Sequence, residues 1–318
     1  MRFEVGGGRT MGNTLTRKQF DILAALEEMN EKVTQRELAE MTGHGLGTIN
    51  KVVNELEEIG CLKECEVTEK GLEMLEPYRV KRAVVIAAGF GSRMVPITLN
   101  TPKPLVRVHG ERIIDSILDA IVAAGIEEIY LVRGYLAEQF DQLLYKYPMI
   151  KFVENPSYNE ANNISSAVCV RNLLQNAYVF EADLLLHNPK LIKKYHYNSN
   201  FLGIPIERSD DWCFETKNRI IQTQQVGGEA KSLNKSGNWG VYQEVGISYW
   251  DTEDGARLEE HLLQAFEMPG GKELYWDQVP FLRFKGQYEV EIRECKFEDI
   301  IEIDTFKELK MIDKTYDV

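Results

Sequence analysis

Apolar residues recur at helical spacing through the first quarter of the chain. Between residues 14 and 75 they follow one another three or four positions apart, as in Phe20, Leu23 and Leu26. This spacing is typical of amphipathic helices. Thr34 followed by Glu37 has the spacing of a capping box, which predicts that a helix begins there. We therefore expect a small, largely helical domain over residues 13–78, preceded by a flexible, Gly-rich leader at residues 1–12.

A turn and a short hairpin complete this pattern. The segment TGHGLG at 42–47 predicts a turn before a second helix at 46–58, and residues 61–71 alternate like a small hairpin. The order resembles the winged helix-turn-helix of bacterial regulators, with 46–58 as the recognition helix and 61–68 as the wing. The resemblance implies a small α+β winged-helix domain.

Strands and helices alternate after residue 81, which is typical of a mostly parallel sheet covered by helices. Residues 82–89 (RAVVIAAG) form a continuous apolar run, as buried parallel strands do. We therefore expect an α/β, Rossmann-like domain over residues 79–318. The further strands expected are 128–134, 150–155, 177–183, several short ones between 201 and 250, and a last one at 300–304; the further helices are 113–122, one from about 136, 162–174, 253–266, 275–284 and one at the C-terminal end.

The charge balance argues against a protein that coats nucleic acid. The chain has 37 Lys and Arg against 50 Asp and Glu, a formal net charge of −13, whereas phosphate backbones attract basic surfaces. Thr48, Asn50 and Lys51 of the expected recognition helix could face DNA, but Glu57 and Glu58 follow closely and would repel it. We expect a structural or regulatory role for the winged helix, with DNA binding as the alternative.

Composition narrows the class of protein further. The 44% hydrophobic and 27% charged positions are ordinary globular values. The five cysteines are scattered without a CxxC pair, which does not suggest a disulfide framework. No apolar stretch reaches the roughly 18 residues of a membrane span, so we expect a cytoplasmic protein without a membrane partner.

A glycine loop after the first expected strand is the main candidate for chemistry. Residues 87–93 read AAGFGSR, and Lys103 follows in the segment TPKPLV. Glycines at 89 and 91 allow backbone N–H groups to turn toward an anion, as in phosphate-binding loops. A tight turn would explain the loop alone equally well. The combination of strand, loop, nine residues and KPL favours phosphate binding.

This combination resembles the nucleotidyltransferases that join a nucleoside triphosphate to a phosphorylated small molecule. Further segments resemble the bacterial Lic-type phosphocholine cytidylyltransferases. These segments are RGYLAEQFD, the NN-x-x-S run at 162–166, EAD at 181–183, ELYWDQV at 273–279 and EIDT at 302–305. The resemblance implies Mg²⁺-dependent condensation of CTP with phosphocholine, giving CDP-choline and pyrophosphate.

Carboxylates at two strand ends are candidate metal ligands. Asp183 ends an apolar strand, where open α/β sheets place their ligands, although a lone aspartate there is also read as a helix cap. Glu302 and Asp304 are alternate residues and share one face of another strand. Mg²⁺ prefers such oxygen ligands. The resemblance implies that Asp183 and Asp304 hold the metal, with Glu302 nearby.

The resemblance also assigns roles in nucleotide binding. Arg93 is expected to meet the β and γ phosphates and Lys103 the charge around the α-phosphoryl group. For Asn163, capping of a helix is an equally good interpretation. The expected nucleotide-binding set is Ala87, Ala88, Gly89, Phe90, Gly91, Ser92, Gly134, Tyr135, Asn163 and Ser166.

Aromatic residues are candidates for holding the choline group. A quaternary ammonium donates no hydrogen bond, so aromatic faces and a nearby carboxylate hold it best. Trp212, Tyr275 and Trp276 could form such a cage, with Asp277 as the carboxylate. The alternative is that Tyr275 or Trp276 belongs to the core of an amphipathic helix.

Two other functions share parts of this pattern. A sugar-1-phosphate nucleotidyltransferase would use Arg93, Lys103 and Asp183 but needs sugar-hydroxyl partners in place of the aromatic residues. A transcription regulator that senses a nucleotide or phosphocholine is the second alternative. The complete glycine loop, Lys103 and both metal carboxylates argue against a sensor, which does not need catalytic charges.

Overall fold

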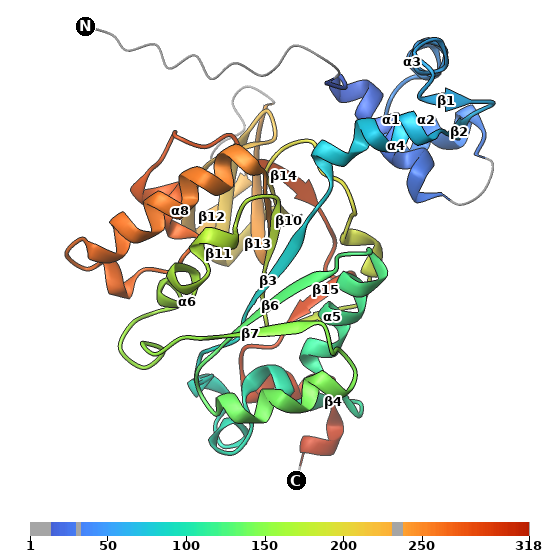
Figure 1. Cartoon of the computed structure of the whole chain (residues 1–318). Helices are drawn as coiled ribbons and strands as arrows, with labels where there is room; N and C mark the ends of the chain where they lie inside the picture. Colours follow the sequence, from blue (N-terminus) through green and yellow to red (C-terminus); the bar gives the residue numbers. More distant parts are fainter. Residues whose placement is uncertain (1–13, 30–32, 231–237, 318) are drawn as a thin grey trace, which may run out of the picture. The chain divides into compact units, whose positions relative to one another are not determined.

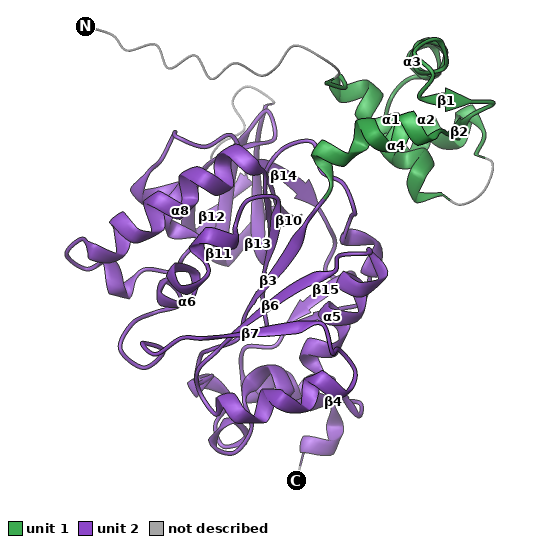
Figure 2. Ribbon diagram, in the orientation of Figure 1, with its two compact units in different colours: residues 1–79 green, residues 80–318 purple. Residues whose placement is uncertain are grey.

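Two compact units, residues 1–79 and 80–318, make up the chain (Figure 2). The structure is a computed structural model, and it describes residues 14–29, 33–230 and 238–317. The expected leader, residues 1–12, lies outside the described residues. Each unit has its own buried apolar residues, so each is described by itself.

The first unit is built on three helices, α1 (Arg17–Glu28), α2 (Gln35–Thr42) and α3 (Leu46–Glu58). Their apolar faces meet in a small core that contains Leu23 and Leu38, both without solvent exposure. Thr34 and Glu37 form the capping box that the sequence predicts: the Thr34 hydroxyl accepts from the Glu37 N–H, and the Glu37 carboxylate accepts from the Thr34 N–H.

A hairpin and a fourth helix complete the winged helix. β1 (Leu62–Lys63) pairs antiparallel with β2 (Glu66–Val67), and α4 (Glu69–Leu75) follows. Glu64 and Cys65 form the two-residue turn, both in the left-handed region with φ of 52° and 62°, as the tightest hairpin turns require. The prediction of two helices followed by a wing is therefore confirmed.

The second unit is organised by a mixed sheet in the described residues. Four neighbouring strands are parallel, as predicted: β7 (Ile150–Glu154), β6 (Glu128–Arg133), β3 (Arg82–Ile86) and β8 (Ala177–Glu181). The sheet changes direction where β13 pairs antiparallel with β8. The strands beyond β8 are, in spatial order, β13 (Trp239–Trp250), β11 (Arg208–Lys217), β12 (Ile220–Glu229), β14 (Glu291–Glu294) and β10 (Asn200–Pro205).

Helices cover both faces of this sheet (Figure 1). Val85 of β3 packs in a core with α5 (Ile113–Ala123), whereas its neighbour Val84 packs with α6 (Ile164–Cys169) and α8 (Thr252–Glu267). Alternate residues of β3 thus face opposite layers, as strand geometry requires. This arrangement leaves the carboxyl ends of β3 and β8 as the place where loops converge.

Several elements differ from their predicted form. The strands between 201 and 250 are long rather than short, because β11, β12 and β13 have 10, 10 and 12 residues. The predicted helix at 162–174 is shorter, α6, and residues 137–145 form a 3₁₀ helix. Near 275–284 only a π-helical turn at Val279–Arg283 is present. Pro280 there removes a backbone donor, and the backbone N–H of Trp276 donates to the Asn163 side chain.

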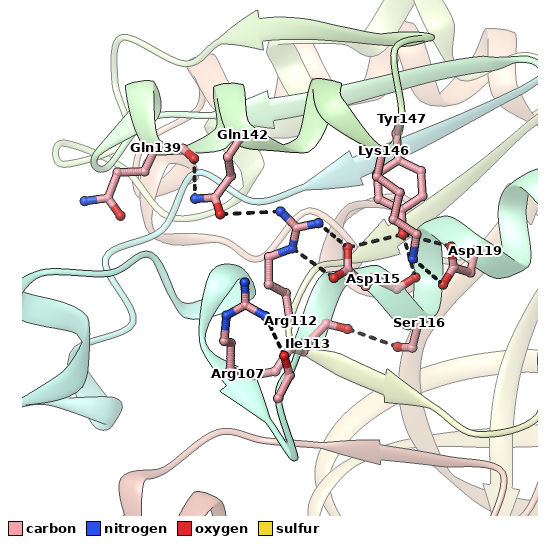
Figure 3. A network of polar contacts seen from close by, with 11 residues as sticks. Arg107, Arg112, Ile113, Asp115, Ser116, Asp119, Gln139, Gln142, Lys146 and Tyr147 are labelled. Carbon is pink, nitrogen blue, oxygen red and sulfur yellow. Dashed lines mark hydrogen bonds and ion pairs between the residues drawn. The ribbon is translucent and has the colours of Figure 1, made fainter.

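A polar network holds α5 against the 3₁₀ helix at residues 137–145 (Figure 3). Arg112 donates two hydrogen bonds to Asp115, each 2.9 Å long. The Tyr147 hydroxyl donates to Asp119 at 2.9 Å and to Asp115 at 3.2 Å. Burial and these two carboxylates raise the pKa of Tyr147, so its hydroxyl keeps its proton and the network stays intact at neutral pH.

A separate two-stranded sheet brings the C-terminal segment to the end of β8. β15 (Ile300–Glu302) pairs antiparallel with β9 (Leu184–Leu186), and Glu302 lies opposite Leu184. α9 (Phe306–Ile312) follows. Glu302 is thereby placed beside Asp183, which lies 119 positions earlier in the sequence. None of the helices in the described ranges combines the length and the apolar character that crossing a membrane requires.

We predict that Gly255→Ala destabilises the second unit. A Cβ at residue 255 would lie 2.6 Å from the backbone oxygen of Leu174, and overpacking of this kind costs about 1–3 kcal/mol. Helix propensity alone would favour Ala by about 1 kcal/mol. All four tryptophans lie between residues 212 and 276, so urea unfolding followed by tryptophan fluorescence reports on this unit.

Gly47→Ala in α3 is the matched control. A Cβ at residue 47 has nothing within 4 Å, and the residue belongs to the first unit. We expect no change in the fluorescence transition for this variant. A Gly255→Ala protein as stable as the wild type would contradict the packing described for α8.

Candidate active site

The glycine loop leaves the carboxyl end of β3 and folds onto Lys103. Gly91 has φ of 69°, and a Cβ there would lie 3.0 Å from the Cβ of Lys103. Glycine is therefore required both for the left-handed backbone and for the close approach. The Thr98 hydroxyl donates to the Gly91 oxygen at 3.0 Å, which fixes the loop against the following segment.

The predicted base and ribose residues lie beside this loop. The Ala87 N–H donates to Val132, and the Tyr135 N–H donates to the Ala88 oxygen at 3.0 Å. The rings of Phe90 and Tyr135 meet edge to face at 4.7 Å. The two loops, after β3 and after β6, are thus joined by backbone and ring contacts.

Lys103 lies between two of the predicted metal carboxylates. Its ammonium nitrogen donates to Asp183 Oδ2 at 2.7 Å and to Asp304 Oδ1 at 2.8 Å, and only 8% of the residue is exposed. Burial alone would lower the pKa of Lys103, but the two carboxylates outweigh burial and raise it. Lys103 therefore carries its positive charge at neutral pH.

Arg93 adds a second cation on the solvent side. Its Nη1 and Nη2 atoms lie 2.8 and 2.9 Å from the two carboxylate oxygens of Asp304. This is the bidentate geometry that guanidinium groups adopt with carboxylates and phosphates. The two predicted phosphate-binding cations are thus close together, and both are bound to acidic residues.

Three carboxylates gather at the end of β8. One oxygen from each of Glu181, Asp183 and Glu302 lies within 4.8 Å of the others. Asp183 Oδ1 is buried and has no hydrogen-bond partner in the described part of the chain. Desolvation and the charge of Asp183 raise the pKa of Glu181. The oxygen donor set and the unpartnered Asp183 atom fit a hard divalent cation such as Mg²⁺.

Glu181 is a residue that the sequence analysis did not select. It precedes Asp183 by two positions, so strand alternation was the available signal. Asp304 is not part of the close cluster, and its carboxylate accepts from Arg93 and Lys103. The structure therefore brings Asp183 and Glu302 together and adds Glu181.

Asn163 begins α6, but its side chain does not cap that helix. Its amide nitrogen donates to Glu181 at 3.2 Å, and its amide oxygen accepts from the backbone N–H of Trp276 at 2.9 Å. Asn163 thus links the carboxylate cluster to the segment that carries Trp276. This role differs from the capping alternative.

Ser166 and Gly134 are closely packed. Ser166 is 2% exposed, and its hydroxyl accepts from the Asn155 amide at 3.0 Å. A Cβ at Gly134 would lie 2.7 Å from the side chain of Tyr158. These contacts give both residues a packing role and leave Ser166 little surface for a nucleotide.

The four predicted choline-binding residues are divided between surface and core. The rings of Trp212 and Tyr275 meet at 6.0 Å, and Tyr275 is 40% exposed. Trp276 is only 1% exposed and packs in the core against Phe201. The alternative that Tyr275 or Trp276 belongs to the core therefore holds for Trp276, and its predicted place in the cage is corrected because core side chains enclose its ring.

Asp277 is buried beside two polar residues that sequence reasoning missed, Gln224 of β12 and Glu244 of β13. The Gln224 amide nitrogen donates to Glu244 Oε2 at 2.6 Å and also to Asp277 Oδ2. Desolvation, together with the negative charge of Asp277, raises the pKa of Glu244 well above its usual range, and burial also raises the pKa of Asp277. The only available signal was two polar residues in otherwise buried strands.

Comparisons with known families agree with both units. Residues 83–200 match the family described as "MobA-like NTP transferase domain", and residues 13–70 match the "MarR family". The solved structure of a CTP:phosphocholine cytidylyltransferase from Streptococcus pneumoniae has a TM-score of 0.65 and 28% identity, and the match covers 74% of this chain and 99% of that one. Fold and site therefore define a nucleotidyltransferase with an N-terminal winged helix.

Sequence relatives specify the class further. The chain is 33% identical to a 2-aminoethylphosphonate cytidylyltransferase of Lancefieldella rimae, over 74% of this chain and 92% of the relative. It is 28% identical to a choline-phosphate cytidylyltransferase of Streptococcus pneumoniae, over 73% of this chain and 97% of the relative. The chain belongs to the cytidylyltransferase family.

The raised pKa values of Glu244 and Asp277 predict how stability changes with pH. A folded-state pKa above the unfolded value gives stability that is present below the unfolded pKa, about 4, and declines as pH rises toward the folded pKa. We expect Glu244→Gln to remove part of this loss of stability at high pH. The difference in urea midpoint, variant minus wild type, should therefore be larger at pH 8 than at pH 5.

Glu207→Gln, at an exposed position, is the control and should shift the midpoint equally at both pH values. A Glu244→Gln difference that stays constant or shrinks between pH 5 and pH 8 would argue against burial of this carboxylate.

Proposed function

We propose that the second unit transfers the cytidylyl group of CTP to a small phosphorylated or phosphonylated amine and releases pyrophosphate. The observation that carries this proposal is the position of Lys103. It lies with Arg93 beside the glycine loop, and its ammonium group binds Asp183 and Asp304. Phosphocholine, the acceptor predicted from the sequence, and 2-aminoethylphosphonate, for which one relative is named, both belong to this acceptor class.

The reaction would be a single in-line displacement. An oxygen of the acceptor's phosphate or phosphonate forms a bond to the α-phosphorus of CTP, and the bond from that phosphorus to the bridging oxygen of the β-phosphate breaks. The electron pair leaves with pyrophosphate. The attacking oxygen is already anionic, so no general base is needed, and catalysis depends on positioning and charge stabilisation.

The charged residues have matching roles in this scheme. Lys103 would stabilise the negative charge around the α-phosphoryl group, and Arg93 would bind the β and γ phosphates with the N–H groups of the glycine loop. Asp183, Glu302 and Glu181 would hold Mg²⁺, with Asp304 adjacent. When bound, the ion would neutralise phosphate charge.

The alternatives account for less of the site. A sugar-1-phosphate acceptor calls for hydroxyl partners, whereas Trp212 and Tyr275 form an aromatic pair, and Tyr275 comes two residues before the buried acidic residue Asp277. A sensor domain without turnover would not need Lys103 between two carboxylates. The aromatic pair therefore favours an amine acceptor, and the position of Lys103 favours an enzyme.

For the winged-helix unit we propose a structural or regulatory role rather than non-specific DNA binding. Glu57 and Glu58 of α3 are both exposed and would repel a phosphate backbone. A tight, steeply salt-dependent complex with random duplex DNA would contradict this proposal.

We predict that Asp183→Asn lowers kcat at least about a hundredfold, because loss of electrostatic stabilisation has effects of this size. The measurement is pyrophosphate release from CTP and an acceptor at saturating Mg²⁺. Asp210→Asn, at an exposed position of β11, is the control and should keep wild-type turnover. Near-normal kcat in Asp183→Asn, with unchanged Mg²⁺ dependence, would remove Asp183 from the proposed metal site.

We predict that Trp212→Ala weakens acceptor binding with little effect on CTP. A cation over an aromatic face contributes roughly 0.5–2 kcal/mol, which corresponds to about a two- to thirtyfold rise in the acceptor KM. Trp239→Ala is the control. Trp239 lies opposite Lys217, the last residue of β11, and its loss should leave the acceptor KM unchanged. An unchanged acceptor KM in Trp212→Ala would place the amine elsewhere.

A further inference from the structure

Gln224 uses the two ends of its side-chain amide unequally. The residue is 2% exposed, and its Nε2 donates to both Glu244 and Asp277. Its Oε1 is fully buried and has no hydrogen-bond partner among the described residues. Turning the amide over would place Oε1 against two carboxylate oxygens. The orientation with a free Oε1 is therefore the favourable one.

A buried acceptor without a donor is unusual and calls for an explanation. The lack of a donor at Gln224 is more unusual because its surroundings are acidic and the described residues show no ion pair to Glu244 or Asp277. Gln224 Oε1 therefore lacks a donor, whereas the two carboxylates accept from Gln224 Nε2 but face no cation among the described residues. An ammonium group would supply both an N–H donor for Oε1 and the positive charge.

These residues lie on one face of the sheet. Gln224 lies opposite Phe214 in the β11–β12 pairing, so Gln224 and Trp212 point to the same side by strand alternation. Cys213 lies opposite Gln243, which places Glu244 on that side as well. Trp212, whose ring contacts Tyr275, and the acidic group around Gln224 therefore face the same side of the sheet, as parts of one acceptor site would.

Asn163 connects this site to the predicted metal carboxylates. It donates to Glu181 and accepts from the backbone N–H of Trp276, one residue before Asp277. A small molecule with an amine at one end and a phosphate or phosphonate at the other would fit this arrangement, with its amine at Gln224 and its anionic end toward Lys103.

We propose that Gln224 Oε1, with the carboxylates of Glu244 and Asp277, binds a primary ammonium group, so that the enzyme prefers an aminoethyl phosphate or phosphonate over the trimethylated acceptor. This inference rests on the proposed function. Three N–H donors match three acceptors, whereas a quaternary ammonium would leave Gln224 Oε1 unsatisfied. A site built to bind a donor rejects an analogue that lacks it.

The direct test compares phosphoethanolamine with phosphocholine, which differ only in three N-methyl groups. We expect kcat/KM for phosphoethanolamine to be about ten- to a hundredfold higher in the wild-type enzyme, because one unsatisfied buried polar group has an effect of this order. Equal values, or a preference for phosphocholine, would overturn the inference. This comparison needs no variant and so does not depend on folding of a mutant.

Gln224→Leu tests the residue itself. We expect it to reduce the preference at least about fivefold, because the KM for phosphoethanolamine rises more than the KM for phosphocholine, with the CTP constant little changed. Gln225→Leu is the matched control, because Gln225 is the next residue of β12 and is exposed on the opposite face. A preference that survives in Gln224→Leu would remove Gln224 from the amine site.

Binding separates this inference from the proposed function. Calorimetry of each acceptor, in the presence of Mg²⁺ and a non-hydrolysable CTP analogue, measures the ammonium preference without turnover. Absence of pyrophosphate with CTP and every acceptor would contradict the proposed function. Tighter binding of phosphoethanolamine would still support the amine site, and equal binding would overturn it.

Discussion

The ammonium group of Lys103 is the interaction on which the catalytic unit depends. It joins the segment after the glycine loop to Asp183, 80 positions later, and to Asp304, 201 positions later. Removing one partner of a buried ion pair is strongly destabilising, because the other charge is left uncompensated. The same arrangement is suited to a phosphate-transfer site, since cations and carboxylates that neutralise one another can also bind phosphate and a divalent metal.

The first half of the sheet and the glycine loop were readable from sequence because their signals are local. The apolar run at 82–89, the glycines at 89 and 91 and the capping box at Thr34 can each be recognised within a few consecutive residues. The antiparallel strands β11, β12 and β13 were harder to predict. Their length and pairing depend on register between distant residues, which no single segment encodes.

The difference between local signals and pairing of distant residues also explains which acceptor-site residues could be predicted from the sequence. Trp212 and Tyr275 are conspicuous in sequence, so aromatic residues guided the prediction of a quaternary ammonium. Gln224 and Glu244 are ordinary polar residues until the sheet places them beside Asp277. Trp276, equally conspicuous, lies in the core. In the proposed function, the residues that would bind the amine therefore lie on or beside the antiparallel half of the sheet, whereas the glycine loop follows a strand of the parallel half.

The most direct test of the account is a ³¹P NMR spectrum of the products formed from CTP, Mg²⁺ and phosphoethanolamine by the wild type and by Lys103→Met, with the fold of the variant checked by tryptophan fluorescence. The account predicts that the wild type converts the α-phosphorus of CTP into a phosphoanhydride with the acceptor and releases pyrophosphate, while Lys103→Met leaves CTP unchanged. Formation of the same products by a folded Lys103→Met protein, or release of orthophosphate without the phosphoanhydride, would contradict it.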